Sequence, residues 1–528
     1  NVAYIIKIGA IMGLIAVIMA VGGVLGAWFA SKAAMNFGAD LRMDLFEKIQ
    51  QFSFQNIDNF STGSLITRLT NDITQIQNMI MMTLRMCLRS PGILIGAMVM
   101  AFVISPKMAA IFIIVLPVLA VLIVVIMRRA FPQFRTLQEK LDALNSCIQE
   151  GLVGIRLIKS FVRGDYEEMR FEKRNQQLKE ANLTAMKTML LYTPLMTLAL
   201  NITTVVVVWS GGNMIVAGNM QVGDLTAFTN YIVQIMSSLT MLSIAFLNWA
   251  RAIASFRRVG EVLNEKIDLT DENAKHKDRA VCEGSVEFQN VSFRYYKNSP
   301  EWVIENISFK LEAGKTLGII GSTGSGKSTL VSMIPRLYDT DEGTVLVDGI
   351  NVRDYGLKPL REGIGMVLQN NTLFSGSITE NLKWGDEHAD EKAVRKAAQN
   401  AQAAGFIDSF KDGYRTRLEQ SGNNVSGGQK QRLCIARALL KCPKILILDD
   451  STSAVDTATE RAIREALHSE YKDMTKIIIA QRIRSVMDAD EILVLDNGKT
   501  AGFGTHEQLL ADCPVYREIY DVQNGREE

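Results

Sequence analysis

Apolar residues form long runs before about residue 255 and short runs after it. Five runs are long enough to cross a bilayer, which takes about 20 helical residues: 8–30, 86–105, 108–127, 190–209 and 227–250. The polar stretches 31–85 and 128–189 between them predict helices that continue outside the membrane. We therefore expect an α-helical transmembrane domain over residues 1–262.

Positive charges beside the spans predict their orientation. Lys32, Arg128 and Arg251 follow the first, third and fifth spans, whereas loop 211–223 has no Lys or Arg and loop 105–107 has one. Because positively charged loops stay in the cytoplasm, the two other loops are expected outside. The sequence starts at Asn1, without an initiator Met. We expect a further span ahead of it, which would bring both chain ends into the cytoplasm.

Two polar segments interrupt the predicted helices outside the membrane. Segment 58–72 contains Gly63 and several capping residues, and segment 160–171 is similar. Such residues favour a helix end followed by a turn. We interpret both segments as coupling elements that lie on a cytoplasmic domain, with ordinary solvated loops as the alternative.

Short β-branched runs mark the second half of the chain and predict strands. They are 316–320, 343–347, 445–448, 476–479 and 492–495. Helical segments lie between several of them, and this alternation predicts an α/β domain with a mainly parallel sheet. The charged stretch 263–283 lacks apolar periodicity and is the expected linker to a domain over residues 284–528.

Net charge and cysteine content exclude some classes of function. A net charge of +1 indicates no nucleic-acid partner. None of the six cysteines forms a C-x-x-C pair, so we predict neither a zinc site nor a disulfide framework.

A glycine-rich loop lies directly after the run 316–320. It fits the pattern G-x-x-x-x-G-K-[ST] and leads into a predicted helix over 330–337, as a phosphate-binding loop requires. Its backbone N–H groups would cradle phosphates, its Lys would reach the β- and γ-phosphates, and its first hydroxyl after the Lys would bind Mg²⁺. The predicted ATP-binding residues are Gly321, Ser322, Thr323, Gly324, Ser325, Gly326, Lys327, Ser328 and Thr329.

A second part of the site is predicted at the end of the run 445–448. The apolar strand ends in Asp449 and Asp450. Ligands of α/β folds bind at the carboxyl ends of parallel strands. Asp449 is therefore the expected Mg²⁺ partner of Ser328.

The segment Val425-Ser-Gly-Gly-Gln429, followed by Lys-Gln-Arg, is similar to the ABC signature motif. With it, nearly the whole chain resembles the ABC transporter superfamily, and specifically the half-transporters of bacterial heterodimeric multidrug exporters with a six-helix type I fold. The resemblance implies that Gln369 is the Q-loop glutamine, at the metal and the catalytic site. It also implies that 453–456 is the D-loop, with Asp456 at its end, and that Tyr295 stacks on adenine, with Tyr296 as a substitute.

The signature residues predict a partner chain. Ser426, Gly427, Gly428 and Gln429 lead into a predicted helix, and a helix N-terminus favours an anion. In the family this motif caps the γ-phosphate that a facing domain holds. The resemblance therefore implies a dimer with a second ABC half-transporter chain.

Two positions depart from the family pattern. Asp450 stands where a Glu usually positions the attacking water, and its side chain is shorter by about 1.5 Å. Gln481 stands where a switch His is usual, and its amide never carries a positive charge. We expect a degenerate site that binds Mg-ATP and hydrolyses it poorly, while the partner's site does most of the hydrolysis.

The predicted function is that of a cell-membrane exporter subunit that moves drug-like or lipophilic compounds. A lipid or peptide exporter is one alternative, and an ATP-gated channel or regulatory subunit is another. Polar residues within the spans are candidates to line a substrate cavity, because lipid would penalise them; hydrogen bonding between helices is the other interpretation. They are Asn201, Asn230, Gln234, Asn248 and Arg251.

Overall fold

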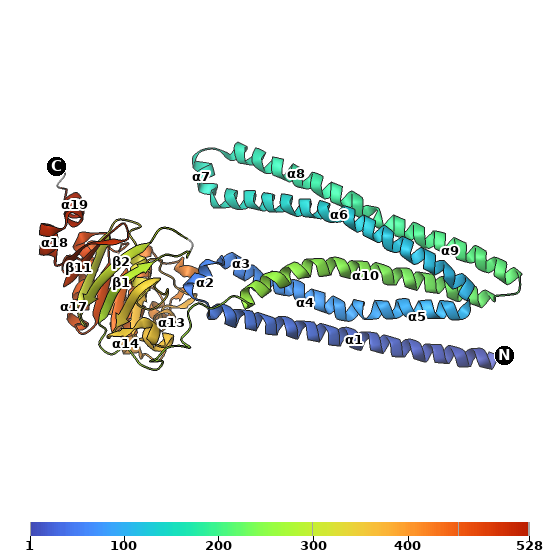
Figure 1. The fold of residues 1–528 in the computed structure, drawn as a ribbon, viewed down its shortest axis with the longest axis horizontal. Helices are drawn as coiled ribbons and strands as arrows, with labels where there is room; N and C mark the ends of the chain where they lie inside the picture. The colour runs from blue at the N-terminus through green and yellow to red at the C-terminus, as the bar shows by residue number, and fades with distance from the viewer. Residues whose placement is uncertain (1, 298, 452, 526–528) are drawn as a thin grey trace. The chain divides into compact units, whose positions relative to one another are not determined.

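The computed structural model describes residues 2–297, 299–451 and 453–525. The chain forms two compact units. The helical unit contains residues 1–49 and 63–264, and the other unit contains residues 50–62 and 265–528 (Figure 1). A short piece of the N-terminal half therefore belongs with the C-terminal half.

Long helices make up the helical unit. Their bounds are α1 Val2–Gln50, α3 Thr62–Thr67, η1 Arg68–Asp72, α4 Ile73–Met82, η2 Thr83–Cys87, α5 Arg89–Ile104, α6 Pro106–Val153, α7 Ile155–Ser160, α8 Gly164–Leu190, α9 Tyr192–Val216 and α10 Val222–Leu263. Helices α6 and α8 run side by side (Figure 1). Phe112 of α6 and Phe228 of α10 stack in the core, with ring centroids 5.3 Å apart.

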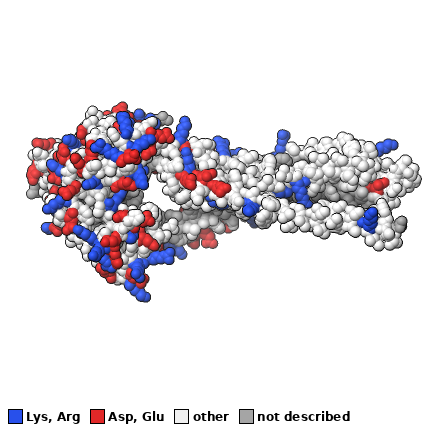
Figure 2. All heavy atoms as spheres, turned by 90° about the horizontal axis from the view of Figure 1, so that it is seen from below, with Lys and Arg blue, Asp and Glu red and all other residues white. Residues whose placement is uncertain are grey.

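Among the described residues, four helical stretches are long and apolar enough to cross a membrane. They are Val2–Gln50, Thr62–Ile104, Pro106–Val153 and Gly164–Val216, and they contain the first four predicted spans except for Ser105, the last residue of the second. The fifth predicted span, 227–250, falls within α10. On the face shown in Figure 2, Lys, Arg, Asp and Glu are sparse along this unit, as hydrocarbon requires.

Both predicted helix breaks are present, and the structure has an additional break just before the first one. Helix α1 ends at Gln50, α2 spans Phe54–Asp58, and the backbone is helical again from Thr62. Residues 59–61, between α2 and α3, are non-helical and lie inside the predicted segment 58–72. At the additional break, a capping box starts α2, in which Ser53 Oγ accepts from the Asn56 N–H at 3.1 Å. The second break, between α7 and α8, falls inside the predicted segment 160–171.

In the described part of the second unit, a six-stranded sheet has the order β12-β11-β3-β10-β9-β6. Its strands pair in parallel except for the edge strand β12. Four of the five predicted strands lie in this sheet, as expected for a mainly parallel arrangement. The bounds are β3 Thr316–Gly321, β6 Ile364–Val367, β9 Ile445–Asp449, β10 Thr475–Ile479, β11 Glu491–Asp496 and β12 Lys499–Gly504.

A separate antiparallel sheet has the order β2-β1-β4-β5. It contains the fifth predicted run as β4 Glu342–Val347, together with β1 Val286–Phe293, β2 Ile304–Leu311 and β5 Ile350–Asn351. A β7–β8 pair, Gly376–Ser377 with Arg417–Leu418, completes the strands. Stacked Phe288 and Phe309, with centroids 4.7 Å apart, join β1 to β2.

Helices cover the sheets of this unit. They are α2, α11 Lys327–Ser332, η3 Val352–Asp354, α12 Leu357–Glu362, α13 Ile378–Leu382, α14 Glu391–Asn400, α15 Ala404–Ser409, η4 Gly413–Arg415, η5 Gln420–Gly422, α16 Gly427–Leu440, α17 Thr457–Glu470, η6 Ile483–Ser485, α18 His506–Asp512 and α19 Pro514–Gln523. The α16 and α14 helices pack in one apolar cluster, whereas α11 packs in another with the antiparallel sheet.

A single carboxylate fastens the end of the predicted linker. Asp348, in the turn between β4 and β5, accepts the N–H groups of four consecutive residues, at 2.7, 3.1, 2.7 and 3.0 Å. These residues are Cys282, Glu283, Gly284 and Ser285. A carboxylate is the group best suited to collect several backbone donors.

We predict that Asp348→Ala destabilises the chain by about 2–3 kcal/mol, because four backbone donors lose a charged acceptor. Asp348→Asn should cost less, since Asn keeps one acceptor and tolerates the left-handed backbone, with a φ of 50°. Chemical denaturation of the full chain in detergent measures both effects. Asp354→Ala is the control, because Asp354 makes a surface ion pair with Lys275 at 3.4 Å. An equal loss in Asp354→Ala would contradict the prediction.

Candidate nucleotide-binding site

The site lies where four parallel strands end. The glycine-rich loop follows β3, Gln481 follows β10, Asp449 ends β9 with Asp450 next to it, and Gln369 lies just beyond β6. Ile479 pairs with both Ile319 and Asp449, so these strand ends are level with one another. The fold thus brings the predicted loop, the predicted metal ligands and three of the predicted catalytic residues, Gln369, Asp450 and Gln481, to one edge of the sheet.

Glycines in the loop allow the chain to pass close to its neighbours. A Cβ at Gly321 would lie 2.1 Å from the Leu495 carbonyl oxygen. Gly326 has a φ of 90°, and a Cβ there would lie 2.6 Å from Ile304. Side chains do not fit at these positions, so the motif's glycines follow from sterics as well as from phosphate binding.

The amine of Lys327 lies over the loop. Its Nζ donates to the carbonyl oxygens of Gly321 and Ser322, at 2.8 and 2.7 Å. Burial lowers the pKa of Lys327, and the charges of Asp450 and Asp449 oppose that shift. Both acids are therefore close enough to stabilise the cation electrostatically.

Ser328 and Asp449 form the oxygen pair predicted for Mg²⁺. Ser328 Oγ donates to Asp449 Oδ1 at 2.9 Å, and Asp449 is buried. Burial raises the pKa of Asp449, while the Ser328 hydrogen bond opposes the rise. A hydroxyl and a carboxylate fit Mg²⁺, which takes one or two protein oxygens and keeps several waters.

Asp450 is in contact with two other predicted catalytic residues, Gln481 and Gln369. Gln481 Nε2 donates to Asp450 Oδ2 at 2.8 Å, and a hydrogen bond from Gln369 also lowers the pKa of Asp450. Burial is the larger influence and raises that pKa. The backbone of Asp450 has a φ of 46°, a costly conformation for a residue with a Cβ and one that occurs at functional sites.

Tyr295 lies beside the helix that follows the loop. Its hydroxyl is hydrogen-bonded to Thr329 Oγ1 at 2.9 Å, and its ring meets Phe293 and Tyr338 edge-on, with centroids 5.1 and 5.3 Å apart. Tyr295 is 36% exposed and Tyr296 is 73% exposed. The Tyr295 ring is thus held by its neighbours and partly exposed, as an adenine platform would require, whereas Tyr296 is mostly exposed.

Sequence reasoning missed the contact between Tyr338 and α2. Tyr338 OH donates to Asp58 Oδ2 at 2.8 Å, and the Phe54 ring lies 6.0 Å from the Tyr338 ring. Asn56 Nδ2 donates to the Lys266 carbonyl at 2.9 Å. Helix α2 thus packs within the second unit and touches the aromatic group around Tyr295. No motif marks Tyr338, since its partners are distant in sequence.

The signature residues start α16. Ser426 Oγ accepts from the Gln429 N–H at 3.3 Å, and Gln429 Oε1 accepts from the Ser426 N–H at 2.9 Å. This capping box orients the helix N-terminus. A Cβ at Gly428 would lie 2.7 Å from the Ala454 carbonyl oxygen, and Gly427 also faces Ala454.

The predicted D-loop is tied to the signature helix. Gln431 of α16 is buried; its Oε1 accepts from the Ala454 N–H at 3.0 Å and its Nε2 donates to Ser453 Oγ at 3.2 Å. Asp456 caps α17 by accepting from the Thr459 N–H at 3.0 Å, and this hydrogen bond lowers the pKa of Asp456. In this chain Asp456 therefore acts as a helix cap. The cap is compatible with a further role of Asp456 toward a partner chain.

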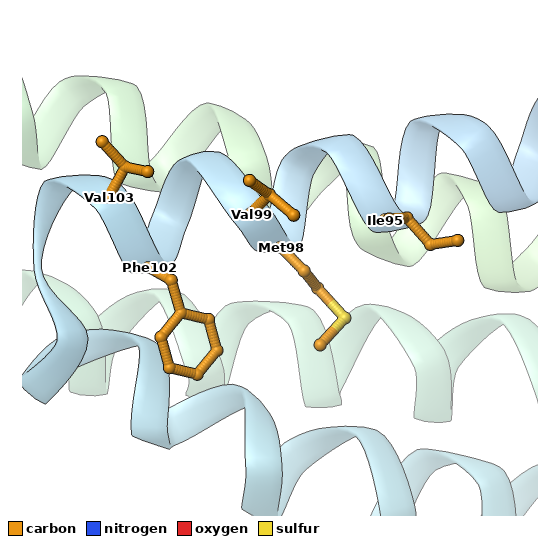
Figure 3. A pocket seen from close by; sticks show the side chains of 5 residues that line it. All are labelled: Ile95, Met98, Val99, Phe102 and Val103. Atoms are coloured by element: carbon orange, nitrogen blue, oxygen red, sulfur yellow. The ribbon is translucent and has the colours of Figure 1, made fainter.

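The candidate cavity residues lie on α9 and α10. Asn201, Asn230 and Gln234 are exposed in the single chain, and the side chains of Asn248 and Arg251 lie outside the described residues. On α5 an apolar pocket of about 450 Å³ is lined by Ile95, Met98, Val99, Phe102 and Val103 (Figure 3). Met98 and Phe102 extend from the same side of α5. Such a surface suits hydrocarbon in general and does not distinguish a drug-like compound from a lipid.

Both halves of the chain match known families. Residues 2–239 match the ABC transporter transmembrane region, and residues 304–453 match the ABC transporter family. The chain is 41% identical, over 98% of its length and 90% of the relative's, to the uncharacterized ABC transporter ATP-binding protein YfiB of Bacillus subtilis. It is 35% identical, over 94% of its length and 85% of the relative's, to the putative multidrug export ATP-binding/permease protein YgaD of that organism.

A solved structure shows the same fold. It is a bacterial Atm1-family ABC exporter with ATP bound, with a TM-score of 0.81 and 26% identity, covering 93% of this chain and 86% of that one. These matches agree with the ATP site at the sheet edge and with the apolar helices. The chain belongs to the ABC transporter family, as a membrane-spanning, ATP-driven exporter with a cytoplasmic nucleotide-binding domain.

Proposed function

We propose that this chain is one subunit of a heterodimeric exporter and that its own ATP site hydrolyses poorly. The observation that carries the proposal is the 2.8 Å hydrogen bond between Gln481 Nε2 and Asp450 Oδ2. The two residues that depart from the family pattern are thus direct neighbours at the place where the γ-phosphate and water would react.

The short side chain of Asp450 is the first reason for slow hydrolysis. Its carboxylate reaches about 1.5 Å less far than that of Glu, and a displacement near 1 Å costs about 10²-fold in rate. One of its oxygens also accepts from Gln481. Less of the carboxylate is then free to orient or deprotonate a water.

The neutral amide of Gln481 is the second reason. It can donate a hydrogen bond to a phosphate oxygen, but it cannot supply the positive charge of a protonated His. Charge stabilisation of the transition state is usually the largest contribution to catalysis. Binding of ATP, by contrast, needs only the loop, Lys327 and the metal ligands.

Mg²⁺ would be held by Ser328 and Asp449, with Gln369 near the γ-phosphate. The ion would neutralise charge on the β- and γ-phosphates. In the chain itself, Ser328 and Asp449 already hold each other at 2.9 Å, so their oxygens are placed for the ion. Lys327 and the loop N–H groups would bind the phosphates.

The signature residues support a division of labour between two chains. Ser426, Gly427 and Gly428 keep the family pattern, and the capping box orients them. The signature helix packs in a different apolar cluster from the phosphate-binding helix. We propose that these residues complete the catalytic site of a second half-transporter chain.

The proposed cargo is a drug-like or lipophilic compound. The relative YgaD of Bacillus subtilis, a putative multidrug export ATP-binding/permease protein, supports this choice. A lipid or peptide cargo is the alternative, and stimulation of ATPase activity by each class would distinguish them. A channel or regulatory subunit would instead show ion current or no flux against a gradient.

The first prediction for the proposed function concerns Asp450 and Gln481, the two positions that depart from the family pattern. The double change Asp450→Glu with Gln481→His should raise ATP turnover at this site by about 10²-fold, because a general base and a cation are restored. Turnover of the chain purified alone measures it, with each single change as a control. Rapid turnover by the unchanged chain, paired with itself, would contradict the proposal.

The second prediction separates the two sites of the complex. Ser426→Ala should lower the ATPase rate of the two-chain complex by about 10²-fold, because the partner's γ-phosphate loses a hydroxyl donor. Asp450→Asn in the same chain should leave that rate nearly unchanged. The reverse order of effects would show that this chain's own site is the active one.

The third prediction tests the adenine platform. Tyr295→Ala should weaken ATP binding about tenfold, in line with the 1–3 kcal/mol of base–aromatic stacking. Tyr295→Phe should retain most of the affinity, because the ring stays and only the hydroxyl bond to Thr329 is lost. Titration with a fluorescent ATP analogue gives the affinities, and Tyr296→Ala is the matched control. A larger loss in Tyr296→Ala would assign the stacking role to that residue.

A further inference from the structure

The last turn of α19 meets the segment that follows β10. Gln523, the final residue of α19, places its side-chain amide between two backbone groups of that segment. Its Oε1 accepts from the Ile483 N–H and its Nε2 donates to the Gln481 carbonyl oxygen, each at 2.8 Å. A backbone N–H needs an acceptor and a carbonyl needs a donor, so the amide fits in one orientation only.

Apolar packing anchors α19 independently of Gln523. Tyr516 is fully buried in a cluster with Ile483 and Val486, and its hydroxyl is 2.7 Å from His506 Nδ1. Gln523 itself is exposed at the end of the helix. The fold of α19 therefore rests on Tyr516 and its neighbours, and the two hydrogen bonds of Gln523 act on the backbone of the segment 481–483.

That segment carries Gln481, one of the two site residues that depart from the family pattern. Upstream, the Ala480 N–H donates to the Ile319 carbonyl of β3 at 3.2 Å. Downstream, Gln523 holds the Gln481 carbonyl and the Ile483 N–H. Because hydrogen bonds hold the backbone on both sides, the Gln481 side chain starts from a fixed backbone position. From there its Nε2 donates to Asp450 Oδ2 at 2.8 Å.

We propose that Gln523 is a positioning residue for the γ-phosphate end of this site: it holds the Gln481 backbone so that the Gln481 amide faces the terminal phosphate of a nucleoside triphosphate. This inference rests on the proposed function, which places Gln481 there. The consequence of this role is selectivity of the site for a triphosphate over a diphosphate. Loss of Gln523 weakens binding of a triphosphate, which Gln481 can touch, and leaves binding of a diphosphate unchanged.

The experiment compares nucleotide affinities of the full chain in lipid nanodiscs with Mg²⁺. The non-hydrolysable analogue AMP-PNP and ADP are titrated by calorimetry against Gln523→Ala and Gln523→Glu. The ratio of AMP-PNP to ADP affinity should fall about threefold to tenfold in Gln523→Ala, the range expected from hydrogen bonds of this kind. Gln523→Glu should lose at least as much, because a carboxylate oxygen would face the Gln481 carbonyl.

Asn524→Ala is the matched control. Asn524 is the next residue and also carries an amide, but it accepts from Arg484 at 3.4 Å and donates to the Tyr520 carbonyl at 3.0 Å. Its change should leave the affinity ratio at the unchanged chain's value. In a Gln481→Ala background, Gln523→Ala should have no further effect on the ratio, since the two residues act through one group.

Several results would overturn the inference. An unchanged ratio in Gln523→Ala, an equal fall of both affinities, or a full effect in the Gln481→Ala background would each assign Gln523 a purely structural role. Equal affinity of the unchanged chain for AMP-PNP and ADP would also overturn it. Fast ATP turnover by the chain alone would contradict the proposed function instead, and the ratio would remain readable because AMP-PNP is not hydrolysed.

Discussion

The in-register parallel pairing of β3, β10 and β9 is the constraint on which the site depends. Ile479 of β10 is level with Ile319 on one side and Asp449 on the other. Because side chains alternate between sheet faces, a slip of one residue would turn Asp449 away from Ser328. The hydrogen bonds of three buried strands therefore determine whether the loop, the predicted metal ligands and the residues 450 and 481 meet.

Burial at this edge creates an electrostatic balance. Removal from water lowers the pKa of Lys327 and raises those of Asp449 and Asp450, and the opposite charges of the three groups counteract these shifts. A cation and carboxylates held together in this way suit the binding of a phosphate chain together with a divalent ion. The same arrangement binds ATP whether or not Asp450 and Gln481 can hydrolyse it, so binding and hydrolysis are separable in this fold.

Contacts lead away from the site in two directions. Thr329, Tyr295 and Tyr338 connect the loop helix to α2, which the chain joins directly to α1 and α3. On another side, Asp450, Gln481 and Gln523 connect the strand ends to α19. Both are chains of contacting groups with short distances. Energetic coupling along either chain of contacts is established by measured interaction energies and not by proximity.

Local pattern alone determined much of this protein. Apolar length identified four of the spans, β-branched runs identified four strands of the six-stranded sheet, and the glycine-rich loop and signature predicted the ATP site, because each is encoded within a few neighbouring residues. The pattern did not predict the antiparallel strands β1 and β2. Asn290 and Asn306 have positive φ values of 47° and 52°, and irregular pairing interrupts the alternation of apolar and polar residues.

Only the tertiary structure could show what distant segments do to one another. The Tyr338–Asp58 contact joins residues 280 positions apart, and the Gln523–Gln481 contact joins residues 42 apart. Neither pair has a periodicity or motif, because a single side chain that bonds a remote carboxylate or backbone leaves no local signature. The sequence could name Asp450 and Gln481 as unusual, but their hydrogen bond exists because the sheet places the ends of β9 and β10 side by side.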